Sequence, residues 1–483
     1  MTLRKKIQIL VVTLALCTPA ARAQDQNSTS DSTGPASPLS PQNSATVRSR
    51  NLPAPAGRGL LSYSPEAQAP ESQPDTHFLS GAESIGLGSL QALRSLFDPA
   101  LRITQSADAG VVAGHTNSVT SLGGSLLFER HGKQSHLTAL YNGAHTFYRP
   151  DSLFDRPYHG LAVSEELQRG RWTLRLRDDM ALSPESAFGN LPTGGAASGP
   201  DSSLTGIKPS LAPSDTIATG RTKRLNNTAL GELSYGLTRR TAMTLVGSYG
   251  VLHFLDSGFI GSRQTSGRIG LDHALNAKNS LALNYGFDDL RFSGSTSRMQ
   301  SHLMQMALGR RITGRLALQL AAGPQILHPR NYGAFNANSW GWSMFSALSY
   351  QQRFSSYALS YFRGITGGSG VLLGSRTDTI SASATHQFAR SWSASVNGGY
   401  ARNNNLTSNG TTASRFENWF GGVTLDRALG QHARMGMNYT FQDQNHIEIC
   451  PVASCGVQSP RQLFTVSLEW HLRPARLESA RRP

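Results

Sequence analysis

The residues with the most distinctive chemistry are two cysteines near the carboxyl end of the chain. Cys450 and Cys455 lie in the stretch EICPVASCGV, which is rich in turn-forming residues. In an exported protein, such a pair forms a small disulfide loop. The alternative is a metal site with His446 as a further ligand, but no other cysteine or histidine stands at ligand spacing. The sequence therefore favours a disulfide and predicts no metal.

Catalytic motifs are missing from the sequence. It contains no G-x-S-x-G, no H-E-x-x-H, no phosphate-binding loop and no cluster of histidines and cysteines. His145, His253 and His328 stand alone near predicted loops, where histidines are usually solvated. We therefore predict that the chain is not an enzyme and carries neither catalytic residues nor a cofactor.

The N-terminus predicts export. Residues 1–23 combine a basic start, an apolar run over 7–16 and a small-x-small site before Gln24, as in a cleaved signal peptide. The apolar run is too short to remain as a membrane-spanning helix. A lipoprotein signal at Cys17 is the alternative, but Leu16 occupies a position that requires a small residue.

The distribution of the basic residues argues against a nucleic-acid partner. The chain has a formal net charge of +15, and the four basic residues of the signal leave +11 after cleavage. Basic and aromatic residues are not clustered in one domain, and an exported protein meets little nucleic acid. Lysine and arginine gather instead in short turns, where they suit the phosphates of a membrane leaflet or simply keep the turns soluble.

Three segments flank the main part of the chain. Residues 24–79 are rich in Pro, Ser, Ala, Asn and Gln, which predicts a disordered periplasmic linker. Residues 80–100 carry leucines at helical spacing and predict a short amphipathic helix, which either plugs the main part of the chain or is a marginal helix in the linker. Residues 473–483 form a basic tail.

From residue 101 to residue 472 the hydrophobic pattern has a period of two. In RMGMNYTFQ (434–442) and LFTVSLEWHL (463–472), apolar residues alternate with polar or small ones, and 172–179 and 280–289 repeat the pattern. Strand side chains point alternately to the two faces of a sheet, so each segment has one apolar and one polar face.

The spacers between these segments also alternate. Short polar turns such as HGKQ (131–134) and RGR (169–171) are followed by longer Gly/Asn/Ser-rich connections, the longest over about 183–227. This indicates about eighteen antiparallel strands (16–18) in a meander, with both chain ends on the short-turn side. The longest connection has room to fold inward as a constriction.

An all-β transmembrane barrel explains these features together. A soluble sandwich predicts aliphatic inner faces and no asymmetry of turns, whereas a barrel in a membrane needs an apolar outer face, a polar inner face and closure. The chain resembles the bacterial outer-membrane β-barrel class, porin-like in size, over about 370 of its 483 residues. The resemblance implies an outer-membrane location with both termini periplasmic, contact with membrane lipids and the barrel assembly machinery, and, by analogy, a homo-trimer.

Aromatic residues on the apolar face suit the two membrane interfaces. The predicted girdle is Trp172, Trp340, Trp342, Tyr350, Tyr357, Trp392, Tyr439 and Trp470. The last strand resembles the aromatic-ended terminal strand that the assembly machinery reads, through Phe464, Val466, Leu468, Trp470 and Leu472. The class often ends at that strand, whereas in this chain RPARLESARRP extends beyond it.

Charges within the strands are assigned to the interior. An arginine on the lipid face costs roughly 2–4 kcal/mol at the membrane midplane, which supports an inward position for Arg175 and Arg268. Their role is either a structural network or a selectivity filter. The predicted lumen charges are Arg175, Arg177, Asp179, Glu232, Arg268, Asp272, Asp288, Glu417 and Glu469.

These observations favour a passive channel for small hydrophilic solutes. Two alternatives stay open: a non-conducting surface or scaffold barrel, and a component of polysaccharide export.

Overall fold

The computed structural model describes the strands of the predicted barrel and most of the turns between them. The predicted signal peptide, linker and cysteine pair lie outside the described residues. The described part belongs to one compact unit, Leu52–Pro483. It comprises residues 96–112, 115–132, 134–150, 156–183, 217, 222–276, 278–313, 315–332, 338–352, 354–389, 391–406, 415–430, 432–447, 460–472 and 475–476.

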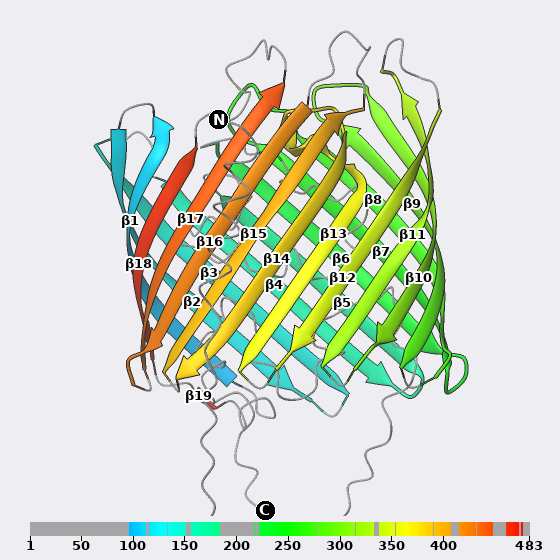
Figure 1. Cartoon of the computed structure of the whole chain (residues 1–483), viewed down its shortest axis with the longest axis horizontal. Helices are drawn as coiled ribbons and strands as arrows, with labels where there is room; N and C mark the ends of the chain where they lie inside the picture. The colour runs from blue at the N-terminus through cyan, green and yellow to red at the C-terminus, as the bar shows by residue number, and fades with distance from the viewer. Residues whose placement is uncertain are drawn as a thin grey trace, which may run out of the picture. The chain divides into compact units, whose positions relative to one another are not determined.

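The fold is a closed antiparallel barrel of eighteen long strands in chain order (Figure 1). Each strand pairs with its neighbours in sequence, and β1 pairs with β18 to close the sheet. The strands are β1 (Leu96–Val112), β2 (His115–His131), β3 (Ser135–Arg149), β4 (Arg156–Arg169), β5 (Trp172–Ser183), β6 (Arg224–Gly236), β7 (Thr241–Phe254), β8 (Ser262–Ala274), β9 (Asn279–Phe292), β10 (Arg298–Arg311), β11 (Leu316–Arg330), β12 (Ser339–Gln351), β13 (Ser355–Thr366), β14 (Ser375–Ala389), β15 (Trp392–Asn405), β16 (Arg415–Ala428), β17 (Ala433–Ile447) and β18 (Arg461–His471), with a two-residue β19 (Ala475–Arg476).

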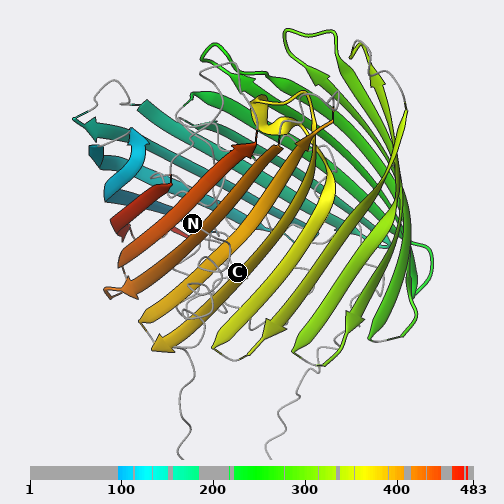
Figure 2. The same cartoon turned by 45° about the horizontal axis from the view of Figure 1, so that its top comes forward.

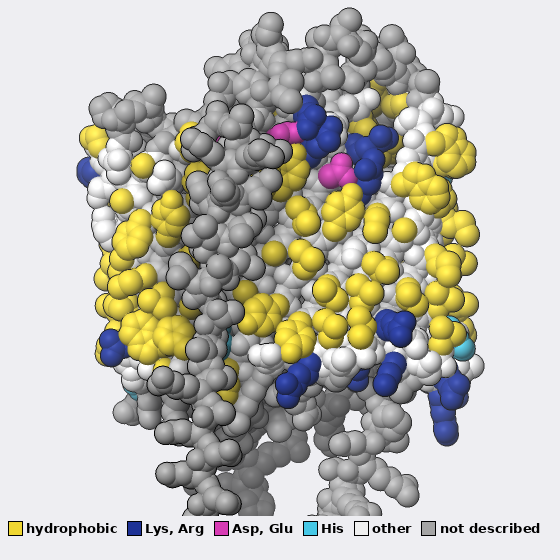
Figure 3. Space-filling view, viewed as in Figure 1, with side chains coloured by type: hydrophobic (Ala, Val, Ile, Leu, Met, Phe, Trp, Pro, Cys, Tyr) yellow, Lys and Arg dark blue, Asp and Glu magenta, His cyan; other side chains and the backbone are white. Residues whose placement is uncertain are grey.

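The period-two pattern sets the two faces of the wall. On β9, Leu283 and Tyr285 are exposed on the outer face, whereas the alternate residues Ala282 and Asn284 are buried on the inner face. The same alternation recurs around the barrel, and Figure 3 shows the resulting belt of hydrophobic side chains on the outer surface. The barrel predicted from sequence is therefore confirmed.

The two ends of the barrel differ in the length of their connections. Two to four residues join the strands at the short-turn end, where the Asn276 side chain accepts hydrogen bonds from the backbone N–H groups of Lys278 and Asn279 (2.9 Å each). The opposite end, here called the long-loop end, carries most of the longer connections, as predicted. One exception is the β1–β2 connection, which spans only residues 113–114 instead of a loop.

The predicted boundary between helix and barrel was wrong. Leu96–Ala100 begin strand β1 instead of ending a helix over 80–100, and the rest of that segment lies outside the described residues. The edge of β1 must be paired for the barrel to close, and Leu96 and Phe97 pair with β2 and with Arg476 and Ala475 of the tail. Sheet pairing therefore overrides the helical spacing of these residues.

An arginine at position 283 tests the orientation of the wall. Leu283 is 51% exposed on the outer face between apolar neighbours, so Leu283→Arg is expected to cost about 2–4 kcal/mol of folding free energy in lipid vesicles. The matched control is Leu275→Arg, because Leu275 is similarly exposed but lies in the β8–β9 turn. Equilibrium urea unfolding of both variants measures the difference, and equal stabilities would contradict the assignment of the outer face.

Candidate functional site

The inner wall of the barrel is lined by polar side chains that bond across strands. The hydroxyls of Ser106 and Thr465 lie 2.9 Å apart, and the Gln325 side-chain amide donates to Ser301 Oγ at 2.8 Å. The side chains of Asn117 and Asn284 also lie on this wall, and among the described residues they have no hydrogen-bond partner. Buried polar groups of this kind need a hydrogen-bond partner, which water or a polar solute supplies.

The interior charges are organised as ion pairs. Arginines and carboxylates that face inward meet within one strand or between adjacent strands, so that each charge largely offsets its neighbour. The pairs are Arg102–Glu469 (2.7 Å), Arg175–Glu166 (3.0 Å), Arg175–Glu232 (3.6 Å), Arg177–Asp179 (2.6 Å), Arg268–Asp288 (2.9 Å), Arg434–Asp426 (2.9 Å) and Arg461–Asp108 (2.6 Å).

The most deeply buried of these pairs depends on a glycine. Arg268 on β8 donates to both carboxylate oxygens of Asp288 on β9 at 2.9 Å, and their side chains are 5% and 0% exposed. Gly286 lies directly opposite Arg268, and a Cβ there would stand 2.6 Å from Arg268 Cδ. The missing side chain therefore lets the arginine lie across the wall and reach the carboxylate.

A second group of inward charges crosses the seam where the barrel closes. On β18, Arg461 donates to both oxygens of Asp108 on β1 (2.9 and 2.6 Å), near the long-loop end. Further along the seam, Arg102 binds Glu469, and His471 Nδ1 lies 3.2 Å from Asp98. The predicted lumen charges did not include Asp98, Arg102, Asp108 or Arg461. The sequence does show that these residues alternate with outward-facing ones. Their pairing, however, depends on the register between the first and last strands, which the sequence pattern does not give.

Eight of the nine predicted lumen charges lie on the inner face, and one does not. Glu417 shares the outer face of β16 with the exposed Trp419 and contacts Arg415. Its predicted lumen position was wrong because it belongs to the odd-numbered outward set, while Phe416 and Asn418 point inward and are buried. The inward residues are Arg175, Arg177, Asp179, Glu232, Arg268, Asp272, Asp288 and Glu469.

The mouth at the long-loop end is narrowed by the β13–β14 connection, residues 367–374. This segment contains a 3-10 turn, Gly368–Gly370, and lies inside the rim (Figure 2). Its residues Gly368, Ser369 and Gly370 all have positive φ, which bends the chain sharply. The backbone N–H of Ile260, in the β7–β8 connection, donates to Gly370 O at 2.8 Å. The β13–β14 loop therefore reaches the part of the wall that carries β7 and β8.

Apolar packing fixes this loop in place. The inner faces of β9, β10 and β11 are hydrophobic at this level, in contrast to the polar wall below. The Tyr332 hydroxyl donates to Leu373 O at 3.2 Å, and burial raises the pKa of Tyr332 far above its ordinary value, so this donor stays protonated. The buried cluster is Leu290, Phe292, Met299, Leu327, Tyr332 and Ile365, with Ile260, Leu373 and Leu406 packed against it.

The longest connection also contributes to the mouth through one described residue. Ile217 is fully buried against Leu372 and Phe416, and its backbone N–H donates to Ser369 Oγ at 3.1 Å. The other residues of the β5–β6 connection between 184 and 221 lie outside the described residues. The connection predicted as a constriction (about 183–227) thus contacts the β13–β14 loop through Ile217, whereas no constriction was predicted for the β13–β14 loop itself.

The predicted girdle residues all lie on the outer face. Trp340 and Trp342 are near the long-loop end and are 70% and 68% exposed. Trp172, Tyr350, Tyr357, Trp392 and Trp470 are near the short-turn end, where Trp172 packs on Tyr235 (4.3 Å between ring centroids) and Arg427 lies 5.0 Å from the ring of Trp392. Tyr439 lies between the two levels. The terminal-strand residues Phe464, Val466, Leu468, Trp470 and Leu472 also face outward.

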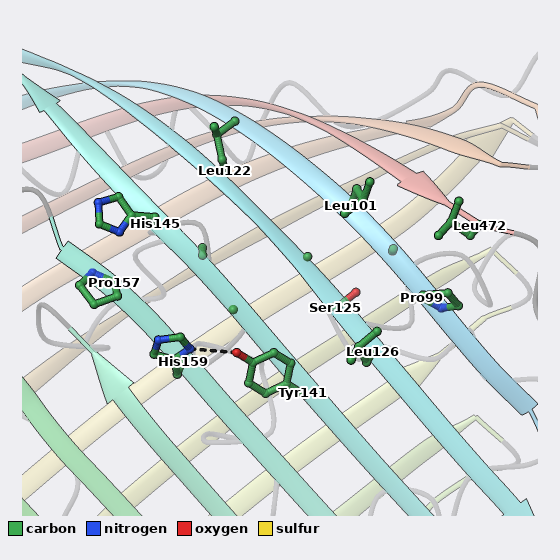
Figure 4. A pocket seen from close by; sticks show the side chains of 14 residues that line it. Pro99, Leu101, Leu122, Ser125, Leu126, Tyr141, His145, Pro157, His159 and Leu472 are labelled. Atoms are coloured by element: carbon green, nitrogen blue, oxygen red, sulfur yellow. Dashed lines mark hydrogen bonds between the residues drawn. The ribbon is translucent and has the colours of Figure 1, made fainter.

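A hollow of about 440 Å³ on the outside of β1–β4 is separate from this interior. Gly124 and Gly143 leave the space, and Leu101, Leu122 and Leu126 border it. The Tyr141 hydroxyl and His159 Nδ1 are 2.9 Å apart at its edge (Figure 4). Because its lining belongs to the outward apolar face, this hollow is part of the surface belt and not of the lumen.

Two further findings concern other kinds of site. Within the described ranges, no group of three or more His, Cys, Asp or Glu residues is arranged to hold a metal ion. In the same part of the chain, no helix has the length and apolar character that crossing a membrane requires.

Comparison with known proteins gives only weak similarity. No protein-family model matches the sequence, and the search of curated proteins gave no match. Among solved structures from Pseudomonas aeruginosa, OpdK with vanillate is 10% identical with a TM-score of 0.41, covering 79% of this chain and 99% of that chain. OccK9 (OpdG) is 12% identical (TM-score 0.40; 78% and 98%), and OccK2 (OpdF) with glucuronate is 11% identical (0.41; 78% and 98%). At this degree of similarity, no property of those proteins transfers to this chain.

Proposed function

We propose that the protein is a passive outer-membrane channel for small hydrophilic solutes, with both termini on the periplasmic side. The observation that carries this proposal is the reversal of polarity across a closed eighteen-stranded wall, apolar outside and hydrogen-bonding inside. Barrels of 16–18 strands enclose enough space for an aqueous path. An apolar exterior with a polar interior suits a hydrated lumen surrounded by lipid.

The paired interior charges predict weak ion selectivity. The chain is strongly basic, but the described inward arginines mostly face carboxylates. Many other arginines lie outside the lumen, for example Arg239, Arg240 and Arg310 at the short-turn end. A net positive protein therefore does not imply an anion channel, and neutral solutes such as sugars fit the wall better than highly charged ones.

Conductance in planar bilayers tests this function. The refolded full chain is expected to give ohmic steps, with a reversal potential close to zero in a salt gradient. A second protein lacking residues 24–95 keeps β1, which begins at Leu96, and tests whether the N-terminal segment blocks the path. Silence of both proteins, each shown to be folded by heat-modifiable gel mobility, would contradict the channel.

A non-conducting scaffold barrel is the second candidate. It is favoured by the apolar cluster at the long-loop end, where Ile365 and Leu373 from the β13 side pack with Leu290 of β9. If this end of the barrel were closed, the wall would serve only as a support for surface loops. The same conductance experiment separates the two candidates.

We also propose three features that extend from the sequence. Cys450 and Cys455 form a disulfide within the β17–β18 connection, residues 24–79 act as a periplasmic linker, and the outward terminal-strand residues serve as the signal for barrel assembly. Association into a homo-trimer through the outer belt is a further proposal. The linker and disulfide can be tested by limited proteolysis and thiol labelling of the purified protein.

A further inference from the structure

Four arginines form a continuous row on the outer face of the barrel. Arg263 on β8 is directly opposite Arg291 on β9, Arg291 is opposite Arg298 on β10, and Arg298 is opposite Arg330 on β11. Adjacent strands are about 4.8 Å apart, so the row spans about 15 Å. Each residue belongs to the outward set of its strand and stands at or next to the long-loop end.

Little negative charge in the wall offsets this row. One carboxylate, that of Asp289, contacts the row. Its Oδ2 lies 3.0 Å from Arg291 Nε, and its Oδ1 contacts Arg298 Nε. Among the described residues, neither Arg263 nor Arg330 has a carboxylate partner. The outer rim of β13–β16 differs, because there Asp378 contacts Arg363 (3.4 Å) and Glu417 contacts Arg415.

Such a row is unfavourable without an external anion. Like charges directly opposite on neighbouring strands destabilise a sheet, and here the juxtaposition occurs three times in succession. The guanidinium group binds phosphate through paired N–H donors. The row therefore has the chemistry and the length to hold more than one phosphate group at once.

The surroundings of the row indicate that the phosphates belong to a lipid. Below it on the same outer face, the Tyr285 hydroxyl lies 2.7 Å from His302 Nδ1, and the rings of His302 and His328 are 5.4 Å apart. Polar rings of this kind suit the headgroup level of a membrane. Further down, Leu283 and Ile269 belong to the exposed apolar belt, where acyl chains lie.

We propose that the arginine row of β8–β11 binds the phosphorylated headgroup of a lipid in the leaflet at the long-loop end. Its chemical class is a lipid with two or more phosphate charges, such as a phosphorylated glycolipid, rather than free phosphate. This site lies on the outside of the wall and is independent of whether the barrel conducts.

Native mass spectrometry of the full chain in detergent tests the site with bisphosphorylated lipid A as the probe. Replacing all four residues (R263Q/R291Q/R298Q/R330Q) is expected to weaken retention of this lipid by about tenfold or more, because each basic residue near an anionic lipid surface adds to the attraction. R263Q/R330Q is a milder variant with an intermediate expected loss. The matched control is R239Q/R240Q/R310Q/R311Q, which removes four exposed arginines at the short-turn end and is expected to behave as wild type.

The other arms identify the ligand chemistry. Lipid A stripped of its phosphates is expected to bind wild type and variants equally weakly, and millimolar inorganic phosphate is expected not to displace the phosphorylated lipid. Equal retention by wild type and the quadruple variant would overturn the proposal. So would equal losses in the control variant, tight binding of the stripped lipid, or displacement by inorganic phosphate.

Discussion

Removing Gly368–Leu373 from the β13–β14 loop is expected to raise single-channel conductance by roughly twofold or more, because a constriction sets the resistance of a pore. The loop lies inside the rim and connects through Gly370 O to Ile260 and through Ser369 to Ile217. A shorter link between Thr366 and Ser375, which are already paired at the ends of β13 and β14, would leave the wall intact.

Two variants make this measurement specific. Gly370→Val should also raise conductance, because Gly370 has a φ of +82° and a side chain there would collide with the ring of Phe254, displacing the loop. The control is a shortened β9–β10 connection (293–297), which is at the same end but contributes no residue to the apolar cluster that packs against the β13–β14 loop. Unchanged conductance in both loop variants would show that the β13–β14 loop does not limit the path.

Breaking the Arg268–Asp288 pair is expected to produce the largest loss of stability. Arg268→Met removes the arginine that bonds both oxygens of a carboxylate that is 0% exposed, and Asp288→Asn removes the negative charge that this buried arginine faces. Removing one partner of a buried pair typically costs about 3–5 kcal/mol, whereas replacing both by well-packed neutral residues is often nearly neutral. Gly286→Ala should act in the same direction, since its Cβ would occupy the path of the arginine.

Equilibrium urea unfolding in lipid vesicles measures this effect, with gel mobility as an independent readout of folding. The double variant R268M/D288N is the control and is expected to be more stable than the sum of the single changes predicts. Additive losses in the double variant, or single losses of less than about 1 kcal/mol, would contradict a coupled buried pair.

The wall was predictable from sequence because its chemistry is local. In 434–442 and 463–472, the alternation of apolar and polar residues predicts which side chains point outward. The outward residues observed on β17 and β18 match that prediction. Polar turns such as that at Asn276 mark the short-turn end. The same rule, applied strictly, would have placed Glu417 with Trp419 on the outer face.

Other features depend on contacts that alternation does not encode. The arginine row exists only in the register of β8–β11, and the seam pair Asp108–Arg461 joins residues 353 positions apart. The β13–β14 loop did carry a signal, since GGSGVLLG (367–374) is apolar where the other long connections are polar. What it packs against is determined by barrel closure, which brings β13–β14 opposite the β7–β8 connection.

Liposome swelling in a size series of neutral sugars tests the central claim most directly, because it measures solute passage without reference to charge. Vesicles with the refolded full chain are expected to swell in small sugars and progressively less in larger ones, and the loop-shortened variant is expected to admit larger sugars than wild type. Swelling no faster than in protein-free vesicles, for both proteins in a folded state, would contradict a passive hydrophilic channel.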